Sequence, residues 1–503
     1  MTMLERFRPK SFIPFEEVER GLRFVTYDGV AVQIMGTFTG GAFIVAFALL
    51  LGANNLTIGL LSALQPLTQI LQIPAIYFVE RVGFRKLLVV SSLTASRLFC
   101  FVLMLIPWLP ESQRLTVFIV ALSFYYGFGT ISGVAWNPWI RDLIPDKRLS
   151  GYMAHRLTVL TGIGAILSLI AAFGIDFYRD SFGEINIYSF YFGLAGVAGL
   201  ISVFFVSRVP EPKLDHNPHL SIIKVILEPI HDRNFRQLLI FLGSWNFAVN
   251  FAAPFFTVYM LQRLNLSMTM ILAFSVLSQM VNVLFFRLWG RLADHFSYKS
   301  VLTETGPLFI LTFLMWPLTS FGNWGFIALP ALIFIHALSG MSTAGVQLCT
   351  GNLAMKLAPR GRATAYLAVN ALISGIAATV APIIGGLMAT FFAGEEITLG
   401  VSWNSRFFGH EIGFLPITLR GLDFVFIIAF VLGLYSLHRL VTIREEGEIE
   451  NGVLIEFRTQ VRKTLSDISS VEGLRDIFAF PYGRLVDLFN RRQTRRQPAE
   501  DRK

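Results

Sequence analysis

The chain has 503 residues, of which 54% are hydrophobic and 15% are charged, and its formal net charge is +9. A soluble protein of this size carries about 25% charged residues, so the composition excludes an ordinary soluble globular domain. The basic residues form no stripe interleaved with aromatic side chains, which argues against nucleic acid as a partner and favours anionic lipid.

Twelve apolar segments follow one another along the chain, each about 20 residues or longer. At about 1.5 Å per residue, a helix of that length crosses a hydrocarbon layer of about 30 Å. The predicted spans are 30–51, 58–79, 87–108, 115–139, 156–175, 186–207, 237–260, 269–290, 301–320, 325–348, 364–392 and 421–440. The sequence therefore predicts an all-α polytopic membrane protein with twelve transmembrane helices.

Lys and Arg fall mainly in alternate loops between these spans. The N-terminal segment 1–29 holds five of them, whereas the next loop, Gly52–Asn55, holds none. The middle loop 208–236 is again rich in basic residues, and the loop after it holds only Arg263. Because cytoplasmic loops carry the excess of positive charge, we expect both termini in the cytoplasm. The first residues lack the apolar core of a cleaved signal peptide, so the first span itself should direct insertion.

Residues also repeat at a constant offset of 214 positions. The matched pairs are Glu80 with Asp294, Arg85 with Lys299, Pro145 with Pro359, Arg148 with Arg362, Tyr152 with Tyr366 and Gln65 with Gln279. One offset at two separate loops predicts two pseudo-symmetric six-helix halves, related by an axis along the membrane normal, with the solute site between them.

The predicted organisation follows from this repeat. The parts are a cytoplasmic N-terminal segment 1–29, an N-terminal half 30–207, a cytoplasmic linker 208–236, a C-terminal half 237–440 and a cytoplasmic amphipathic and basic tail 441–503. The linker continues as an amphipathic run that we expect on the membrane surface. For the tail two interpretations stay open: a peripheral helix with a lipid-contacting end, or a segment that binds a partner or regulates the protein.

Two loops carry related motifs. The first reads IYFVERVGFRK from Ile76 to Lys86, and the second reads GRLADHFSYK from Gly290 to Lys299. Together with twelve spans in two halves, these motifs resemble the loop signature G-x-L-x-D-R-x-G-R-R/K of the major facilitator superfamily. The first keeps Arg81 and Gly83 but has Glu80 for Asp, and the second loses the central Arg-x-Gly. The resemblance covers roughly residues 24 to 441.

The resemblance implies a conformational latch on the cytoplasmic side. A carboxylate there can lie near the positive N-terminus of a helix in the other half, so Glu80 would face the start of the eleventh span. Asp294 would face the start of the fifth span, and Arg85 would pair with Asp142. The latch residues are Glu80, Arg81, Gly83, Arg85, Asp142, Arg148, Gly290, Asp294, Lys299 and Arg362. The alternative is that these charges only anchor helix ends.

Three of the ionisable residues inside predicted spans or at their edge are candidate site residues. Arg97 lies eleven positions past Lys86, about 16 Å into the membrane, where a cation is costly unless it is paired or hydrated. It is a candidate for binding an anion in the central cavity, or for pairing with Asp28. Asp28 is a candidate proton carrier or an end-cap charge, and His336 is a candidate proton-coupling group or a neutral hydrogen-bonded side chain.

Uncharged polar side chains gather at mid-depth, where they suit an organic solute with hydroxyl, amide or carboxylate groups. They are Gln33 and Thr37 in the first span, Gln65 and Gln69 in the second, Trp245, Asn246 and Asn250 in the seventh, Gln279 and Asn282 in the eighth and Asn370 in the eleventh. The alternative role for each is a hydrogen bond between helices.

The sequence holds no Walker phosphate loop and no His, Cys, Asp cluster with metal-ligand spacing, so we expect no ATP-driven step, no metal, no other cofactor and no enzyme. Cys100 and Cys349 lie inside predicted helices, which argues against a disulfide framework. We predict a monomeric secondary transporter in a bacterial-type inner membrane. It would move a small anionic or polar neutral solute by alternating access, coupled to a proton or to the solute's own gradient.

Two alternatives to this function stay open. The run around Pro382 and the 48 Phe residues favour efflux of a drug, although the lack of an acid at the bilayer centre disfavours a cationic one. The long tail favours a non-transporting scaffold or receptor on the same fold.

Overall fold

The computed structural model describes most of the chain. The described residues are 9–10, 12–72, 74–75, 84–213, 228–320, 325–359, 362–400, 402–405, 410–413 and 417–445. The middle of the predicted linker and almost all of the predicted tail lie outside them, as do Glu80, Arg81 and Gly83.

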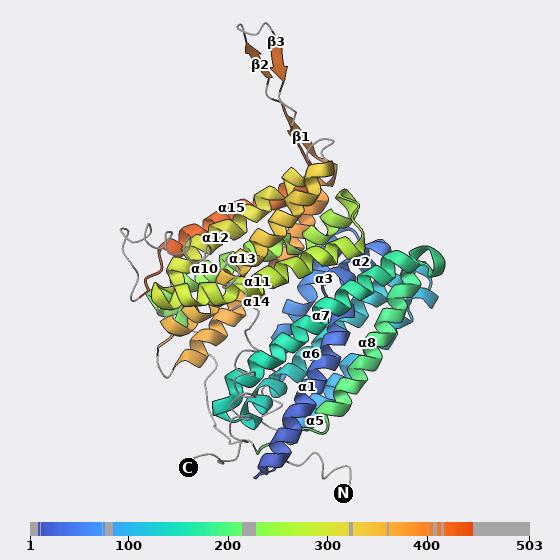
Figure 1. Ribbon diagram of the computed structural model, residues 1–503, viewed down its shortest axis with the longest axis vertical. Coiled ribbons are helices and arrows are strands. Elements are labelled where there is room, and N and C mark those ends of the chain that lie inside the picture. The colour runs from blue at the N-terminus through green and yellow to red at the C-terminus, as the bar shows by residue number, and fades with distance from the viewer. Residues whose placement is uncertain are drawn as a thin grey trace, which may run out of the picture.

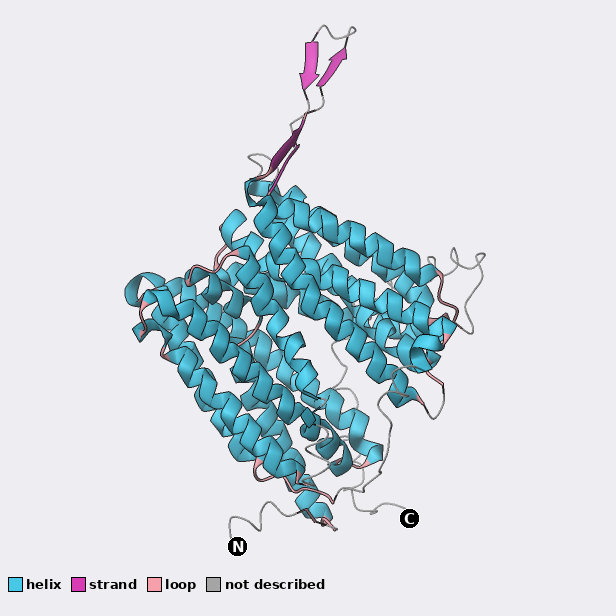
Figure 2. Ribbon diagram, turned by 180° about the vertical axis from the view of Figure 1, so that it is seen from behind, coloured by secondary structure: helices cyan, strands magenta, loops and turns pink. Residues whose placement is uncertain are grey.

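Two bundles of helices make up the molecule (Figures 1 and 2). The first half contains α1 (Phe15–Phe38), α2 (Gly41–Leu50), α3 (Asn55–Thr68), η2 (Gln69–Leu71), α5 (Arg85–Met104), η3 (Ile106–Trp108), α6 (Glu111–Leu143), α7 (Asp146–Phe182) and α8 (Glu184–Val206). The second half contains α10 (Arg233–Val258), η4 (Tyr259–Arg263), α11 (Met268–His295), α12 (Tyr298–Met315), η5 (Pro317–Ser320), α13 (Gly325–Leu357), α14 (Ala363–Phe391), η6 (Phe392–Gly394) and α15 (Leu422–Val441).

Within the described residues, eleven helices are long and apolar enough to cross a membrane. The first of them, Phe15–Leu50, is formed by α1 and α2 together. The predicted span 58–79 corresponds to α3, which has 14 described residues and a short η2 extension, and part of that span lies outside the described residues. The all-α membrane class is confirmed, whereas the count of twelve is not.

The first helix begins well before its predicted span. α1 starts at Phe15, although the apolar pattern begins at residue 30. Its first turn carries Glu16 and Glu17. Charged residues end a run of apolar residues in the sequence, but a helix can continue through them with these side chains on its polar face. The chain turns between α1 and α2, where Gly41 has a φ of +53°, a backbone conformation that favours glycine.

Among the described residues, the main contacts between the two halves join four pairs of helices: α3 with α14, α7 with α11, α2 with α10, and α3 with α10. We call the end of each bundle where α1 begins and α15 ends the terminal end, and the opposite end the strand end. Near the strand end, the Asn55 side-chain amide donates to the Ala389 carbonyl at 3.2 Å. A Cβ on Gly386 would lie 2.7 Å from the Asn55 carbonyl oxygen, so glycine permits this close approach.

An acidic side chain also joins the halves at the strand end. The Asp176 carboxylate, on α7, accepts hydrogen bonds from the backbone N–H groups of Met268 (3.0 Å) and Thr269 (2.7 Å) at the start of α11. The N-terminus of a helix carries partial positive charge and free N–H groups, so a carboxylate stabilises it.

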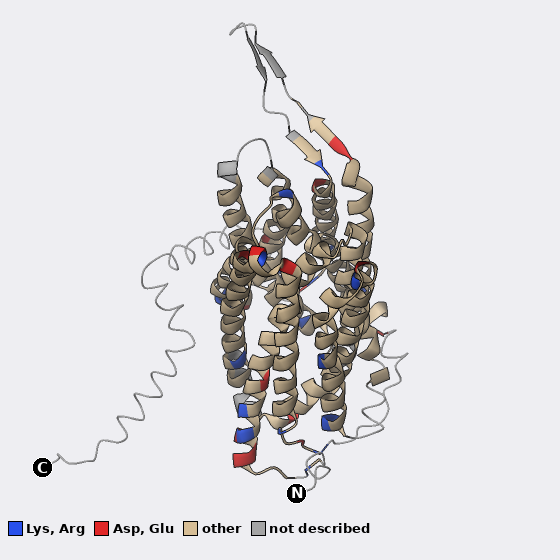
Figure 3. Ribbon diagram, turned by 90° about the vertical axis from the view of Figure 1, so that its right-hand side faces the viewer, with Lys and Arg blue, Asp and Glu red and all other residues tan. Residues whose placement is uncertain are grey.

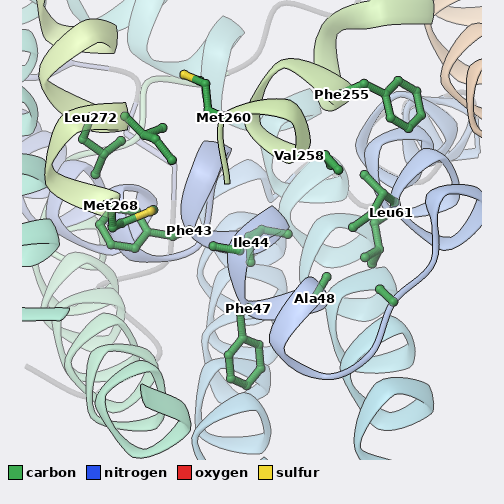
Figure 4. Packing of buried hydrophobic residues seen from close by; sticks show 14 of the residues in the cluster. Phe43, Ile44, Phe47, Ala48, Leu61, Phe255, Val258, Met260, Met268 and Leu272 are labelled. Atoms are coloured by element: carbon green, nitrogen blue, oxygen red, sulfur yellow. The ribbon is translucent and has the colours of Figure 1, made fainter. Parts of the chain in front are cut away.

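The apolar core is shared between the halves only toward the strand end. There one buried cluster includes Phe43 and Phe47 of α2 together with Phe255 and Val258 of α10 (Figure 4). Toward the terminal end the core divides in two. One cluster surrounds Trp139 in the first half, and a separate one surrounds Phe235 in the second half. The halves are therefore packed together at one end and hold separate cores at the other.

Short strands extend from the strand end, where the sequence predicted only a long loop (Figures 1 and 2). β1 (Glu396–Leu399) pairs antiparallel with β4 (Ile417–Arg420), and β2 (Ser402–Ser405) pairs with β3 (His410–Gly413). Lys and Arg gather toward the opposite, terminal end of the bundle (Figure 3).

Candidate functional site: a cavity between the two halves

A cavity of about 780 Å³ lies between the halves. Helices α1, α2, α3, α6 and α7 of the first half and α10, α11 and α14 of the second half line it. The polar residues of its lining are Gln33, Thr37, Ser62, Gln65, Tyr126, Thr161, Ser168, Asn250, Thr257, Ser275 and Gln279. None of the described residues that line it carries a charge. Its volume is in the range of small-molecule sites.

Five of the predicted polar residues meet in this central cavity: Gln33, Thr37, Gln65, Asn250 and Gln279. The pair Gln65 and Gln279, which the repeat predicted, lines it from opposite halves. Two other predicted residues, Gln69 and Asn282, are not part of its lining.

Small hydroxyl residues complete the lining and escaped the sequence analysis. Thr161 and Ser168 on α7 stand seven residues apart, with Gly164 between them, and Ser275 stands four residues before Gln279 on α11. This spacing places each set on one face of its helix, so the pattern was available in the sequence. Gly164 has a further role, because any Cβ there would collide with the Gln33 amide.

A second cavity, of about 320 Å³, lies within the second half. It contains three predicted residues, Trp245, Asn246 and Asn370, beside Gln347 and Ser374. The Asn246 amide donates to the Ser374 hydroxyl at 3.3 Å, and that hydroxyl donates to the Asn370 carbonyl oxygen at 3.5 Å. Polar groups from α10, α13 and α14 therefore meet here.

Arg97 lies in the interior of the first half, outside the lining of both cavities. It is 6% exposed, and its guanidinium donates to the Ser96 hydroxyl at 3.2 Å. Its Nε has no hydrogen-bond partner among the described residues, and its stem packs over Gly199 of α8. In this arrangement Arg97 would not contact a solute in either cavity, and its role in binding stays a prediction.

Asp28 is buried near Arg97 and is 3% exposed. Its carboxylate accepts a hydrogen bond from the Ser202 hydroxyl at 2.6 Å. Among the ion pairs of the described residues, none joins Asp28 to Arg97. The Arg156 guanidinium lies over Gly29, one residue further along α1. The buried Asp28 and Arg97 and the half-buried Arg156 form a charged cluster in the first half, and its role in coupling stays a prediction.

His336 lies in the apolar core of the second half. Its ring stacks on Phe274 with centroids 5.0 Å apart, and its Nδ1 lies 2.9 Å from the Leu332 carbonyl oxygen. The contact with Leu332 gives the ring a hydrogen-bond partner, and the role of His336 in proton coupling stays a prediction.

The described latch residues lie at the terminal end of the halves. Arg85 forms the expected ion pair with Asp142 at 2.6 Å. Arg362 pairs with Glu228, Lys299 is buried, and Asp294 is exposed. Gly290 lies within α11, and the side chain of Arg148 is outside the described residues. Whether any of these residues acts as a latch stays a prediction.

Two buried carboxylates at the terminal end were not predicted from the sequence. Glu211 accepts from the backbone N–H groups of Arg85 (2.8 Å) and Lys86 (3.3 Å), which begin α5. Glu445 accepts from those of Tyr298 (3.3 Å) and Lys299 (2.8 Å), which begin α12. Each Glu follows the last helix of its half, so the two contacts repeat one design. A Glu shortly after the sixth and the twelfth span was the signal in the sequence.

The sequence matches the Major Facilitator Superfamily over residues 29–382. No curated protein matches the chain.

Several solved structures share the fold. The chain is similar to a crystal structure of a mutant of the nucleoside transporter NupG, with a TM-score of 0.61, 11% identity and coverage of 85% of this chain and 100% of that chain. It is similar to a POT family transporter in complex with 5-aminolevulinic acid (TM-score 0.59, 13% identity, 92% and 100% covered). It is also similar to a bacterial homologue of the iron transporter ferroportin in an inward-facing state (TM-score 0.58, 13% identity, 86% and 99% covered). The chain therefore belongs to the major facilitator superfamily of transporters and is a multi-pass membrane protein.

Proposed function

We propose that this protein is a secondary active transporter that moves a small, uncharged polar organic solute by alternating access. The observation that carries the proposal is the central cavity, which both halves line with amides and hydroxyls and with no described charged residue. A charged solute would lose water there without gaining a charged partner, whereas hydroxyl and amide groups would find hydrogen-bond partners. Of the two solute classes that the sequence predicted, the neutral one therefore fits this lining better than the anionic one.

Alternating access requires two arrangements of the halves around one site. The shared core at the strand end and the separate cores at the terminal end support a state that is closed at the strand end. With the basic terminal end in the cytoplasm, this is the inward-facing arrangement in a bacterial-type inner membrane. We propose a monomer in the lipid bilayer, with both termini cytoplasmic.

The coupling ion in this proposal is a proton carried by Asp28. Its carboxylate is 3% exposed and hydrogen-bonded to Ser202, and the Arg97 and Arg156 side chains lie close by. An ionisable side chain inside a membrane bundle is costly to hold there, so its presence favours a functional role. Asp28→Asn should abolish solute-driven proton flux and leave solute exchange down its own gradient intact. Equal proton flux in wild type and Asp28→Asn would refute the assignment.

Uptake by the purified protein in liposomes tests the proposed function. Neutral D-glucose and uridine, anionic gluconate and cationic choline are the probes, and at least one neutral probe should accumulate while the charged ones should not. Gln279→Ala removes one hydrogen-bonding group from the cavity wall and should raise the KM about threefold to tenfold. The matched control is Gln113→Ala, an exposed amide on α6 outside both cavities. Transport of only a charged probe, or an unchanged KM in Gln279→Ala, would contradict the proposal.

A further inference from the structure

The smaller cavity of the second half adjoins the central one. Asn246 lines the smaller cavity and Asn250 lines the central cavity, one turn apart on α10. The Asn250 side-chain amide donates to the Asn246 carbonyl at 2.8 Å. The two spaces therefore share one helix wall.

The smaller cavity is built from one aromatic side and one polar side. Trp245 is 6% exposed, and its ring centroid lies 5.5 Å from that of Phe309, which also lines the cavity. The polar groups of the lining are the hydrogen-bonded side chains of Asn246, Ser374 and Asn370 and the exposed amide of Gln347. None of the described residues that line it is charged.

This polar set is not a by-product of the duplicated fold. At the offset of 214 residues, Asn370 corresponds to Arg156 (370 − 214), Trp245 to Ala31 and Gln347 to Gly133. The amides and the indole are therefore present in one half only. In the first half the equivalent of Asn370 is a guanidinium, which donates to the Val25 carbonyl at 3.4 Å. This set of amides and the indole is thus a property of the second half alone.

The smaller cavity lies toward the terminal end. Asn370 stands seven residues from the start of α14, about 10 Å along the helix axis. Gln347 stands ten residues before the end of α13, and that end is also terminal. Along α10, which begins at the terminal end, the smaller cavity at Asn246 therefore lies closer to that end than the central cavity at Asn250.

We propose that the smaller cavity is a second binding site for the transported solute, occupied on the way between the central cavity and the terminal end. The inference rests on the proposed function and narrows its substrate to a neutral ring solute, a hexose or a ribonucleoside. The apolar face of such a ring would lie against Trp245, and its hydroxyl groups would meet Asn370 and Gln347. A volume of about 320 Å³ suits one small solute.

Equilibrium binding of radiolabelled D-glucose and of uridine to the purified full chain tests this site. Wild type should bind two molecules of one of these solutes per chain, and the double variant Gln347→Ala, Asn370→Ala should bind one. Each single variant should raise the KM for uptake about threefold to tenfold, as expected for one lost hydrogen bond. Trp245→Phe should remove the quenching of intrinsic fluorescence by the bound solute. Gln113→Ala is the control for all three measurements, and a thermal melt of each variant checks that it is folded.

The outcomes separate the two proposals. One solute per chain, bound more weakly in Gln279→Ala and unaffected in the double variant, overturns the second site and leaves the proposed function standing. Binding of neither probe and uptake of neither probe overturns both.

Discussion

At the scale of single residues, the terminal end of each half is held by one buried carboxylate. Glu211 is 2% exposed and Glu445 is 5% exposed, and each accepts two backbone N–H groups at the start of a helix. Each also lies beside a cation: Arg85 for Glu211 at 3.7 Å, and Lys356 for Glu445 at 2.7 Å. These contacts fix the segment after the last helix of a half to another helix of the same half.

Burial raises the pKa of the Glu211 carboxyl, because desolvation outweighs its hydrogen bonds and its nearby cations. A carboxyl whose pKa is raised in the folded state stabilises the fold when it is protonated. That contribution is therefore present below the pKa of the unfolded chain and is lost as the pH rises through the raised pKa. Glu211→Gln removes this titration. We expect its melting temperature to rise relative to wild type as the pH increases from about 4.5, the pKa of an ordinary glutamate, through the raised pKa of Glu211.

A thiol-reactive dye measures that melt, because the only two cysteines, Cys100 and Cys349, are buried and react on unfolding. Gln113→Ala should show no such pH-dependent difference. A difference between Glu211→Gln and wild type that stays constant with pH would contradict this account.

At the scale of helices, closure of the strand end depends on how α7 meets α11. The Asp176 carboxylate caps α11 across the boundary between the halves, and an acid at a helix N-terminus stabilises it by up to about 2 kcal/mol. Opening the strand end would break both hydrogen bonds. Asp176→Ala should therefore shift the population toward a strand end that is open, by roughly tenfold.

Distances between spin labels at Tyr178→Cys on α7 and Gln262→Cys on η4, both exposed positions, report this shift. The matched control is Asp180→Ala, an exposed acid one turn further along α7. Asp176→Ala should add a longer distance and Asp180→Ala should not. The same distance distribution in both variants would show that the cap does not hold the end closed.

At the scale of helices, the sequence predicted the depth of a residue along its helix but not the face on which it lies. Counting residues placed Arg97 and Gln33 at depth in their helices, but depth does not say which face of the helix meets the cavity. Gln33 lines the cavity, whereas Arg97 turns into the core of its own half. The Thr161 and Ser168 face was visible as a spacing, yet single hydroxyl residues give a weak signal beside amides and charges.

At the scale of the whole molecule, the repeat at 214 residues predicted the two halves and the pairing of Gln65 with Gln279 across the cavity. The antiparallel strands of 396–420 lie in a segment without apolar periodicity, so the sequence pattern did not predict them. The asymmetry between the halves was equally hidden. The asymmetry arises because amides are present at certain duplicated positions in one half and absent in the other. Only the packing of α10, α13 and α14 shows that those positions line the same cavity.

The central claim is that the cavity between the halves opens alternately to the two sides of the membrane. Ser275→Cys places one thiol in the cavity wall, while the two native cysteines are buried. A membrane-impermeant maleimide added separately to right-side-out and to inverted vesicles measures access from each side. The account predicts labelling from both sides, faster from the side that bears the termini. Labelling from one side alone, in every condition including saturating solute, would contradict it.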